Sequence, residues 1–283
     1  KLHDLEFLSV VNWLNEQGSY PQDEIVSLWQ KVLTNQFHDI LPGSSIQIVY
    51  EEAEATYAQI EAELDELIAK QTNKLTAGEE DLSLINTIGV NRREVVDLPD
   101  DQGLALVSLP PYSVVRFGKA QVEESRSVKV TETEGGYQLE NDFVRVKLYQ
   151  NGEVESFYVK NQEREIIEYG EYGNKLVLYD DHPTAFDAWN VDVFYLEKYA
   201  LVKTKANSEI EESDPLRVTI RFERDLGQKS KLVQRISLSA VSPRLDFDCW
   251  VDWQEDQQFL RVLFPLDLRS DQATYEVQFG CVQ

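Results

Sequence analysis

The stretch NQFHDILPGSS, residues 35–45, places a histidine and an aspartate side by side before a Pro-Gly turn. An imidazole nitrogen is a common metal ligand, and a carboxylate binds cations or accepts hydrogen bonds from hydroxyl groups. His38 and Asp39 are therefore candidates for a metal or ligand site. The alternative is local, because histidine in a last helical turn complements the helix dipole and aspartate is ordinary before a turn. Zinc needs roughly three or four ligands, so spacing alone favours the local interpretation.

A second candidate site lies in LYDDHPTAFDAWNVDVFY, where carboxylates crowd around one histidine and one indole. Its candidate residues are Asp180, Asp181, His182, Asp187, Trp189 and Asp192. Carboxylates accept hydroxyl hydrogens, and an indole stacks on the apolar face of a pyranose, so this combination suits sugar binding. The alternative is an acidic surface loop with one aromatic anchor. The third histidine, His3, is interpreted as solvated.

Composition narrows the classes of partner. The chain has 51 acidic and 27 basic residues, a net charge of −24, which disfavours nucleic acid and anionic membranes and favours a neutral or cationic ligand or a metal ion. No apolar run approaches the roughly 20 residues of a membrane span. Two cysteines, Cys249 and Cys281, are too few for a disulfide scaffold, so we expect the protein to lie in the reducing cytoplasm. No phosphate-binding loop or serine-hydrolase motif occurs, and with so many carboxylates no glycosidase pair can be selected by spacing.

The first third of the chain predicts helices. Residues 5–18 place Phe7, Val10, Val11 and Leu14 on one face, and a second helix is predicted from Ser19 to the Pro-Gly turn at 42–43. Residues 44–74 predict a third helix. Ser19 with Gln22 and Ser44 with Gln47 match the capping-box pattern. If the second helix stays regular to its end, Asp39 faces the core and His38 points nearly opposite.

The remaining residues predict β structure, because apolar and polar residues alternate over short runs separated by turn residues. Strands are predicted at 143–149, 153–159, 174–180, 216–223, 231–239, 244–253, 259–268 and 274–279, with a hairpin turn at Asn151-Gly152. The expected fold class is α+β: a helical middle domain at 1–76, a small β segment at 77–118, and a large antiparallel β-sandwich at 119–283 that is incomplete at its C-terminal end.

The run LWQKVLTNQFHDILPGSSIQIVYEEAEATY, residues 28–57, resembles the helical middle domain of the metal-dependent class II α-mannosidases, glycoside hydrolase family 38. The segment around His182 resembles the acidic, aromatic segment of the family's large β domain, although it has histidine where arginine is common. The resemblance implies that an N-terminal catalytic domain is missing from this chain. It makes His38 one ligand of a shared Zn²⁺ and Asp39 a contact to sugar hydroxyls, with the nucleophile and the acid/base upstream, so that no catalytic residue lies here and the fragment alone is inactive.

Three functions remain open at this point. The leading hypothesis is that the chain is part of a retaining, zinc-dependent, cytoplasmic α-mannosidase acting on terminal α-mannosides or oligosaccharides. A hydrolase of mannosylglycerate is the alternative within the same enzyme class, and it would need a basic group that the sequence does not place. A non-catalytic carbohydrate-binding or assembly module is the alternative from another class. Assembly as a homodimer is compatible with the family resemblance.

Overall fold

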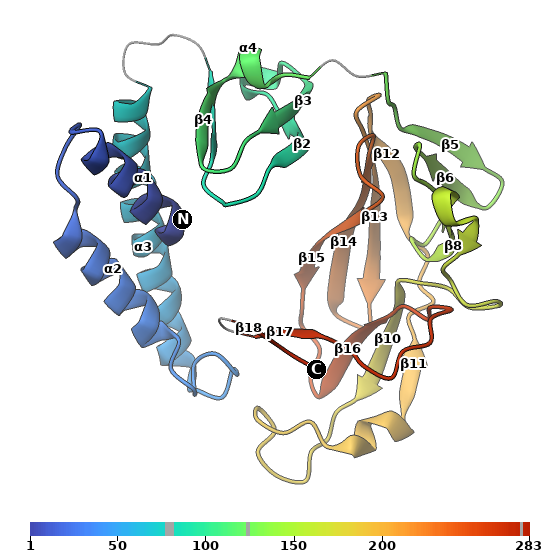
Figure 1. Cartoon of the computed structure of the whole chain (residues 1–283). Helices are drawn as coiled ribbons and strands as arrows, with labels where there is room; N and C mark the ends of the chain where they lie inside the picture. Colours follow the sequence, from blue (N-terminus) through green and yellow to red (C-terminus); the bar gives the residue numbers. More distant parts are fainter. Residues whose placement is uncertain (77–81, 123–124, 278–279) are drawn as a thin grey trace. The chain divides into compact units, whose positions relative to one another are not determined.

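A computed structural model describes residues 1–76, 82–122, 125–277 and 280–283 (Figure 1). The chain divides into two compact units, which are described separately. The first comprises Lys1–Val96, Ala105–Glu123 and Pro183–Asp192, and the second comprises Asp97–Leu104, Glu124–His182 and Val193–Gln283. The predicted boundary between residues 76 and 77 adjoins residues 77–81, which lie outside the described residues. The three predicted domain ranges stay predictions.

Three helices open the chain, as predicted: α1 (Leu2–Leu14), α2 (Gln22–Asn35) and α3 (Gln47–Leu75). Their shared core consists of Leu5, Ile25, Leu28, Ile60 and Leu64, all at most 4% exposed. These residues recur at helical spacing within α2 and α3, so burying them holds the bundle together. Among the helices of the described residues, none combines the length and the apolar character that a membrane span requires.

The predicted core face of the first helix was wrong. The structure buries Leu5, Leu8, Ser9 and Asn12, whereas Leu14 is 68% exposed. Apolar side chains surround most of α1, so periodicity could not distinguish the faces. The decisive contact is polar: the Asn12 amide donates to the carbonyl oxygen and the side-chain oxygen of Gln71 on α3, both at 2.9 Å.

Both predicted capping boxes were also wrong. Pro21 precedes α2 and Ile46 precedes α3, and neither helix has a side-chain cap hydrogen bond. The Gln47 side chain instead donates to Glu51 within the helix. Ser44 and Ser45 turn back toward the preceding turn, so their hydroxyls are not available to α3.

Two small antiparallel sheets follow the helices. Their strands are β1 (Ser83–Asn86) with β4 (Ser113–Arg116), and β2 (Arg92–Asp97) with β3 (Leu104–Leu109). The short helix α4 spans Phe117–Ala120, so the predicted boundary at residue 118 falls within it. Asn86 is fully buried and its amide donates to the carbonyls of Val90 and Pro110, which closes the β1–β4 connection.

The second unit is a β-sandwich, as predicted. One sheet orders β5 (Lys129–Thr133), β6 (Gly136–Glu140), β7 (Val144–Tyr149), β8 (Val154–Val159) and β9 (Arg164–Glu165). The facing sheet orders β12 (Asn207–Ser213), β13 (Arg217–Leu226), β14 (Ser230–Ser239) and β15 (Leu245–Asp252). Their inner faces share a core that includes Leu139, Val146, Ile220, Phe222 and Ile236. The two antiparallel sheets therefore pack face to face.

A third sheet orders β11 (Tyr199–Leu201), β10 (Lys175–Asp180) and β16 (Gln258–Leu263), and β17 (Tyr275–Val277) pairs with β18 (Gly280–Val282). The eight predicted strands correspond to β7, β8, β10 and β13 to β17, although residues 278–279 of the last prediction lie outside the described residues. The predicted Asn151-Gly152 hairpin turn is confirmed between β7 and β8. Gly152 has a φ of +83°, a conformation that favours glycine.

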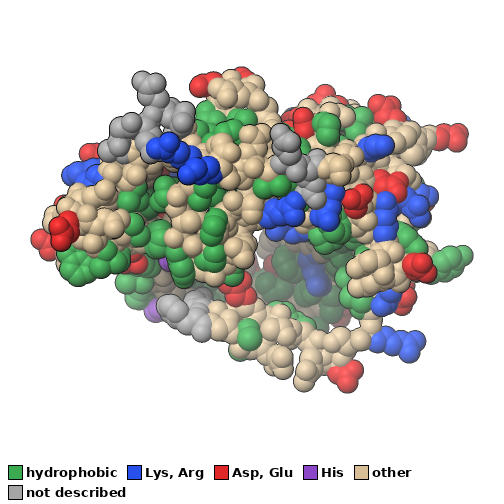
Figure 2. All heavy atoms as spheres, turned by 45° about the horizontal axis from the view of Figure 1, so that its top comes forward, with side chains coloured by type: hydrophobic (Ala, Val, Ile, Leu, Met, Phe, Trp, Pro, Cys, Tyr) green, Lys and Arg blue, Asp and Glu red, His purple; other side chains and the backbone are tan. Residues whose placement is uncertain are grey.

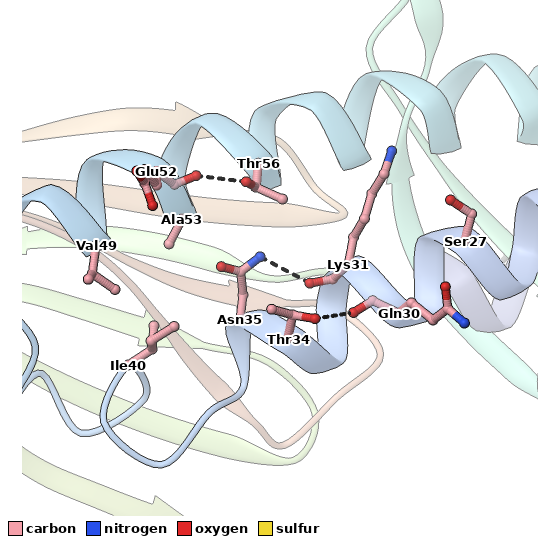
Figure 3. A pocket seen from close by; sticks show the side chains of 10 residues that line it. All are labelled: Ser27, Gln30, Lys31, Thr34, Asn35, Ile40, Val49, Glu52, Ala53 and Thr56. Carbon is pink, nitrogen blue, oxygen red and sulfur yellow. Dashed lines mark hydrogen bonds between the residues drawn. The ribbon is translucent and has the colours of Figure 1, made fainter.

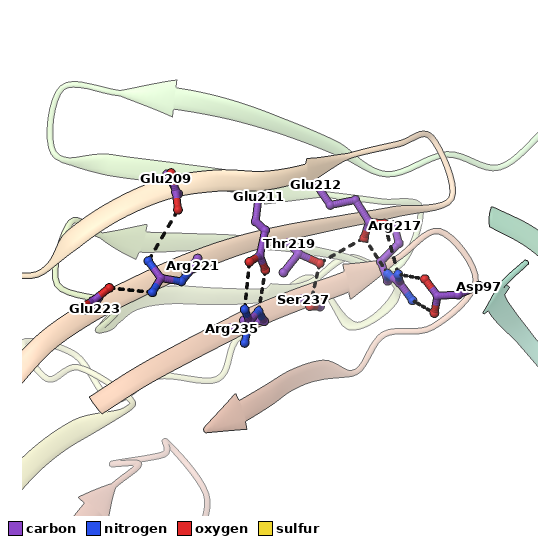
Figure 4. A network of polar contacts seen from close by, with 10 residues as sticks. All are labelled: Asp97, Glu209, Glu211, Glu212, Arg217, Thr219, Arg221, Glu223, Arg235 and Ser237. Carbon is purple, nitrogen blue, oxygen red and sulfur yellow. Dashed lines mark hydrogen bonds and ion pairs between the residues drawn. The ribbon is translucent and has the colours of Figure 1, made fainter. Parts of the chain in front are cut away.

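The outer face of the four-stranded sheet carries paired charges (Figure 4). Arg217 donates to Asp97 at 2.6 Å and to Glu212 at 2.6 Å, and Arg235 donates to Glu211 at 2.6 Å. Arg217 holds the pKa of Asp97 below its usual range. Acidic side chains are scattered over the face drawn in Figure 2, with hydrophobic side chains between them, and do not form one acidic patch.

Candidate functional site

The His38-Asp39 pair lies on a turn between α2 and α3, not on a helix. α2 ends at Asn35, and its last carbonyls accept hydrogen bonds from the backbone N–H groups of Gln36 and Phe37. The turn then closes through the N–H of Ile40, which donates to the Phe37 carbonyl at 2.9 Å. The predicted helical wheel therefore does not apply to residues 38 and 39, and the expectation that Asp39 faces the core was wrong.

Hydrogen bonds to one carbonyl fasten this turn to the start of α3. The main-chain oxygen of Asp39 accepts from the hydroxyl of Ser45 at 2.8 Å, and more weakly from Ser44 and Tyr50 at 3.4 Å. The Ser45 N–H donates to the Tyr50 hydroxyl at 2.8 Å. The turn is thus ordered mainly by Ser45 and Tyr50, whereas Ser44, which the sequence pattern assigned to helix capping, adds one longer bond. No local spacing signal distinguishes the two roles of Ser44.

Both candidate side chains are exposed and lie close together. The His38 side chain is 71% exposed and the Asp39 side chain 52%, with 3.5 Å between Nε2 of His38 and the nearer Asp39 carboxylate oxygen. The Phe37 ring lies against the imidazole, with ring centroids 4.2 Å apart. An exposed imidazole on a fastened backbone can offer one nitrogen to a group outside the chain.

These two residues do not fit a complete zinc site. Among the residues that the structure describes, no three His, Cys, Asp or Glu side chains gather closely enough to hold a metal ion. Protein-bound zinc takes roughly three or four protein ligands. His38 and Asp39 therefore offer part of a donor set, and any metal held there requires ligands from elsewhere.

A groove of about 430 Å³ runs between α2 and α3 beside this turn, and Ile40 lines its end (Figure 3). Three of its polar side chains bond to their own helices: Thr34 donates to Gln30, Asn35 to Lys31, and Thr56 to Glu52, at 2.7 to 3.0 Å. Such bonds to carbonyls four residues back engage donors of these side chains. The Lys31 ammonium donates to Glu63 on α3, so much of the polar lining is engaged within the bundle.

The second candidate segment forms a connection between β10 and β11 that includes the short helix η3 (Val193–Glu197). Asp180 accepts from Lys198 and, at 2.9 Å, from Gln258, and these contacts, Lys198 first, hold its pKa below the usual range. Asp192 accepts from the N–H and hydroxyl of Thr184, and the backbone bond is the larger cause of its lowered pKa. At least two of the candidate carboxylates therefore have protein partners.

Asp181 is half-buried, whereas His182, Asp187 and Trp189 are exposed, Trp189 to 55%. The role of this segment in sugar binding stays a prediction. In the second unit, the sequence patterns missed a cluster of aromatic rings around Arg261. Its guanidinium lies 5.8 Å from the Tyr179 ring centroid and 5.7 Å from that of Tyr195, and it donates to the Tyr195 hydroxyl at 2.8 Å. This contact holds η3 on the sheet. His3 is 66% exposed.

Comparisons with known proteins match both the helical part and the β-sandwich part of the chain to protein families. The family model for the alpha mannosidase middle domain matches residues 1–75, and that for the glycosyl hydrolases family 38 C-terminal domain matches residues 139–283. Human alpha-mannosidase 2C1 is 37% identical over 300 residues, covering all of this chain and 28% of that protein. Alpha-mannosidase G of Dictyostelium discoideum is 27% identical over 344 residues, covering all of this chain and 32% of that protein. The crystal structure of an alpha-mannosidase from Enterococcus faecalis superposes with a TM-score of 0.69 at 15% identity, covering 93% of this chain and 41% of that one.

The helical bundle, the sandwich and these matches define part of a glycoside hydrolase. The chain belongs to glycoside hydrolase family 38, the α-mannosidases, and consists of the family's middle and C-terminal domains. It spans about 28% of the length of human alpha-mannosidase 2C1.

Proposed function

We propose that this chain is part of a zinc-dependent, retaining α-mannosidase that hydrolyses terminal α-mannosides, and that it supplies His38 as one zinc ligand. The observation that carries the proposal is the exposed imidazole of His38 on a turn whose backbone is fastened at Asp39. A ligand held on an ordered turn loses little conformational entropy on binding. The turn lies in the range that the middle-domain model matches, and a histidine ligand from that domain is what the resemblance of residues 28–57 implies.

The neighbouring carboxylate has a separate role in the proposal. Asp39 lies 3.5 Å from His38, so a sugar hydroxyl beside the metal is within reach of its free carboxylate oxygen. A carboxylate accepting from a hydroxyl makes a strong, directional hydrogen bond. Zinc bound at His38 would draw electron density from the sugar hydroxyls that it contacts. The nucleophile and the acid/base are proposed to lie outside this chain.

Zinc analysis of the full-length protein tests the proposal. His38→Ala is expected to release zinc and to lower kcat/KM for an aryl α-mannoside by more than about 100-fold, because loss of a ligand exceeds the usual effect of an outer-shell change. His3→Ala, at an exposed histidine of α1, is the matched control and should keep both zinc and activity. Unchanged zinc content in His38→Ala would exclude the ligand role.

Asp39→Asn separates the substrate role from the metal role. We expect zinc to be retained while kcat/KM falls roughly 10- to 100-fold, the value of a hydrogen bond to a charged group. Zinc loss in this variant would instead make Asp39 a metal ligand.

A further inference from the structure

The strand β15 forms an open edge of the four-stranded sheet. All eight of its residues pair with β14, from Leu238 opposite Leu245 to Lys231 opposite Asp252. On its other side, no strand of the described ranges pairs with it. Every second residue of an edge strand directs its backbone N–H and C=O away from the sheet, where they can pair with another strand.

The side chains of β15 are unusually exposed for a sandwich strand. Phe247 faces the interior, since it lies opposite the fully buried Ile236, and Val251 shares its face but is 38% exposed. Trp250 lies on the outer face opposite Val233 and is 59% exposed. Half-exposed apolar residues on both faces of a long edge strand mark an interaction surface.

An apolar cavity of about 300 Å³ lies beside the inner face of β15. Leu245 and Phe247 line it together with Phe157, Phe264 and Leu266. The rings of Phe247 and Phe264 pack edge to face with centroids 5.6 Å apart. A strand added to β15 would place alternate side chains toward this interior, which is how added strands gain specificity.

The side chains on the outer face of β15 indicate which charge an added strand should carry. Asp246, Asp248 and Asp252 lie on this face, because they occupy alternate positions with Trp250. If two copies of β15 paired antiparallel about any residue from Phe247 to Trp250, an aspartate of one copy would lie opposite an aspartate of the other. Like charges directly opposite each other destabilise a sheet, so the pattern disfavours self-association and favours a basic strand.

We propose that β15 accepts an extended strand from the part of the full-length protein outside this chain. The strand alternates apolar residues facing the cavity with Lys or Arg facing Asp248 and its neighbours. The matched region makes up only 28% of human alpha-mannosidase 2C1, so a relative of that length carries further polypeptide. A strand tethered in the same polypeptide has a high effective concentration at the edge.

Site-resolved amide hydrogen exchange on the full-length protein tests this proposal. The β15 amides that face away from β14 are expected to exchange as slowly as those that face it. Asp246→Lys, at a position opposite the neutral Ser237 of β14, should repel the basic strand and speed the outward-facing amides at least 10-fold, while the β14-facing amides keep their rates. Asp271→Lys, on an exposed segment outside the strands, is the matched control and should change neither set.

Two results would overturn the proposal. Outward-facing amides of β15 that exchange at the rate of an unstructured peptide in the unmodified full-length protein would show an empty edge. Protection that disappears on dilution of the protein would assign the edge to a second copy.

Discussion

The main-chain oxygen of Asp39 accepts a 2.8 Å hydrogen bond from the hydroxyl of Ser45. The turn that carries His38 is therefore held by a residue at its α3 end. The bond spans six residues and links the middle of the turn to the residues just before α3. The position of His38 therefore depends on a side chain that would never contact the metal.

Removing the Ser45 hydroxyl should loosen the turn without changing any proposed metal ligand. For Ser45→Ala in the full-length protein we expect zinc affinity to fall about 3- to 10-fold, because one neutral hydrogen bond is worth about 1 kcal/mol. Ser44→Ala is the control, since its contact to the same carbonyl is 3.4 Å long, and it should change affinity less. Competition with a chromogenic chelator measures both. Equal affinities in all three proteins would mean that the turn holds His38 by other contacts.

The buried amide pair between α1 and α3 should contribute strongly to the stability of the helical unit. Asn12→Ala removes both 2.9 Å bonds and leaves the oxygens of Gln71 buried, so we expect a loss of about 1 to 3 kcal/mol in the free energy of unfolding. Asn15→Ala, on an exposed residue after the same helix, should change it by less than about 0.5 kcal/mol. Urea unfolding followed by circular dichroism checks both variants. A neutral Asn12→Ala would contradict the assigned core face of α1.

Glu165 should make the sandwich acid-sensitive. Burial by itself raises the pKa of Glu165, but hydrogen bonds from the Ser156 hydroxyl and from the N–H groups of Phe157, Ile167 and Ile166 outweigh it, and the pKa lies below its ordinary value. A carboxyl group with a lowered pKa stabilises the folded state above its unfolded pKa, near 4.3, and this stability is lost as the pH falls through the folded value.

Glu165→Ala tests this directly. We expect the variant to be less stable than the unmodified chain by about 2 kcal/mol at pH 7, with the difference shrinking below about pH 4. Glu168→Ala, an exposed neighbour, is the control and should track the unmodified chain at every pH. A stability difference that does not depend on pH would mean that Glu165 acts through packing and not through its charge.

The strands could be predicted because their evidence is local. β13 and β14 alternate buried and mostly half-buried residues over most of their length, and Gly152 supplies the positive φ of the β7–β8 turn. Each of these features is determined by a few neighbouring residues. In the four- and five-stranded sheets, the strand order follows from antiparallel pairing of consecutive strands, whereas β10 pairs with the distant β16.

The candidate site could be predicted only in part, because its geometry depends on distant contacts. His38 and Asp39 are visible in the sequence, but the strong stop at Pro42-Gly43 concealed the earlier end of α2 at Asn35. The actual turn depends on Ser45 and Tyr50, whose hydroxyls have several alternative partners within a few residues. In α1, a nearly uniform apolar surface left the choice of face to the Asn12–Gln71 contact.

X-ray absorption at the zinc edge of the full-length protein tests the central claim most directly, because it counts the imidazole ligands of the metal. We expect the spectrum of His38→Ala, loaded with zinc at high concentration, to show one imidazole fewer than the unmodified protein, whereas His3→Ala should show the same number. An unchanged imidazole count in fully loaded His38→Ala would show that His38 does not bind the metal.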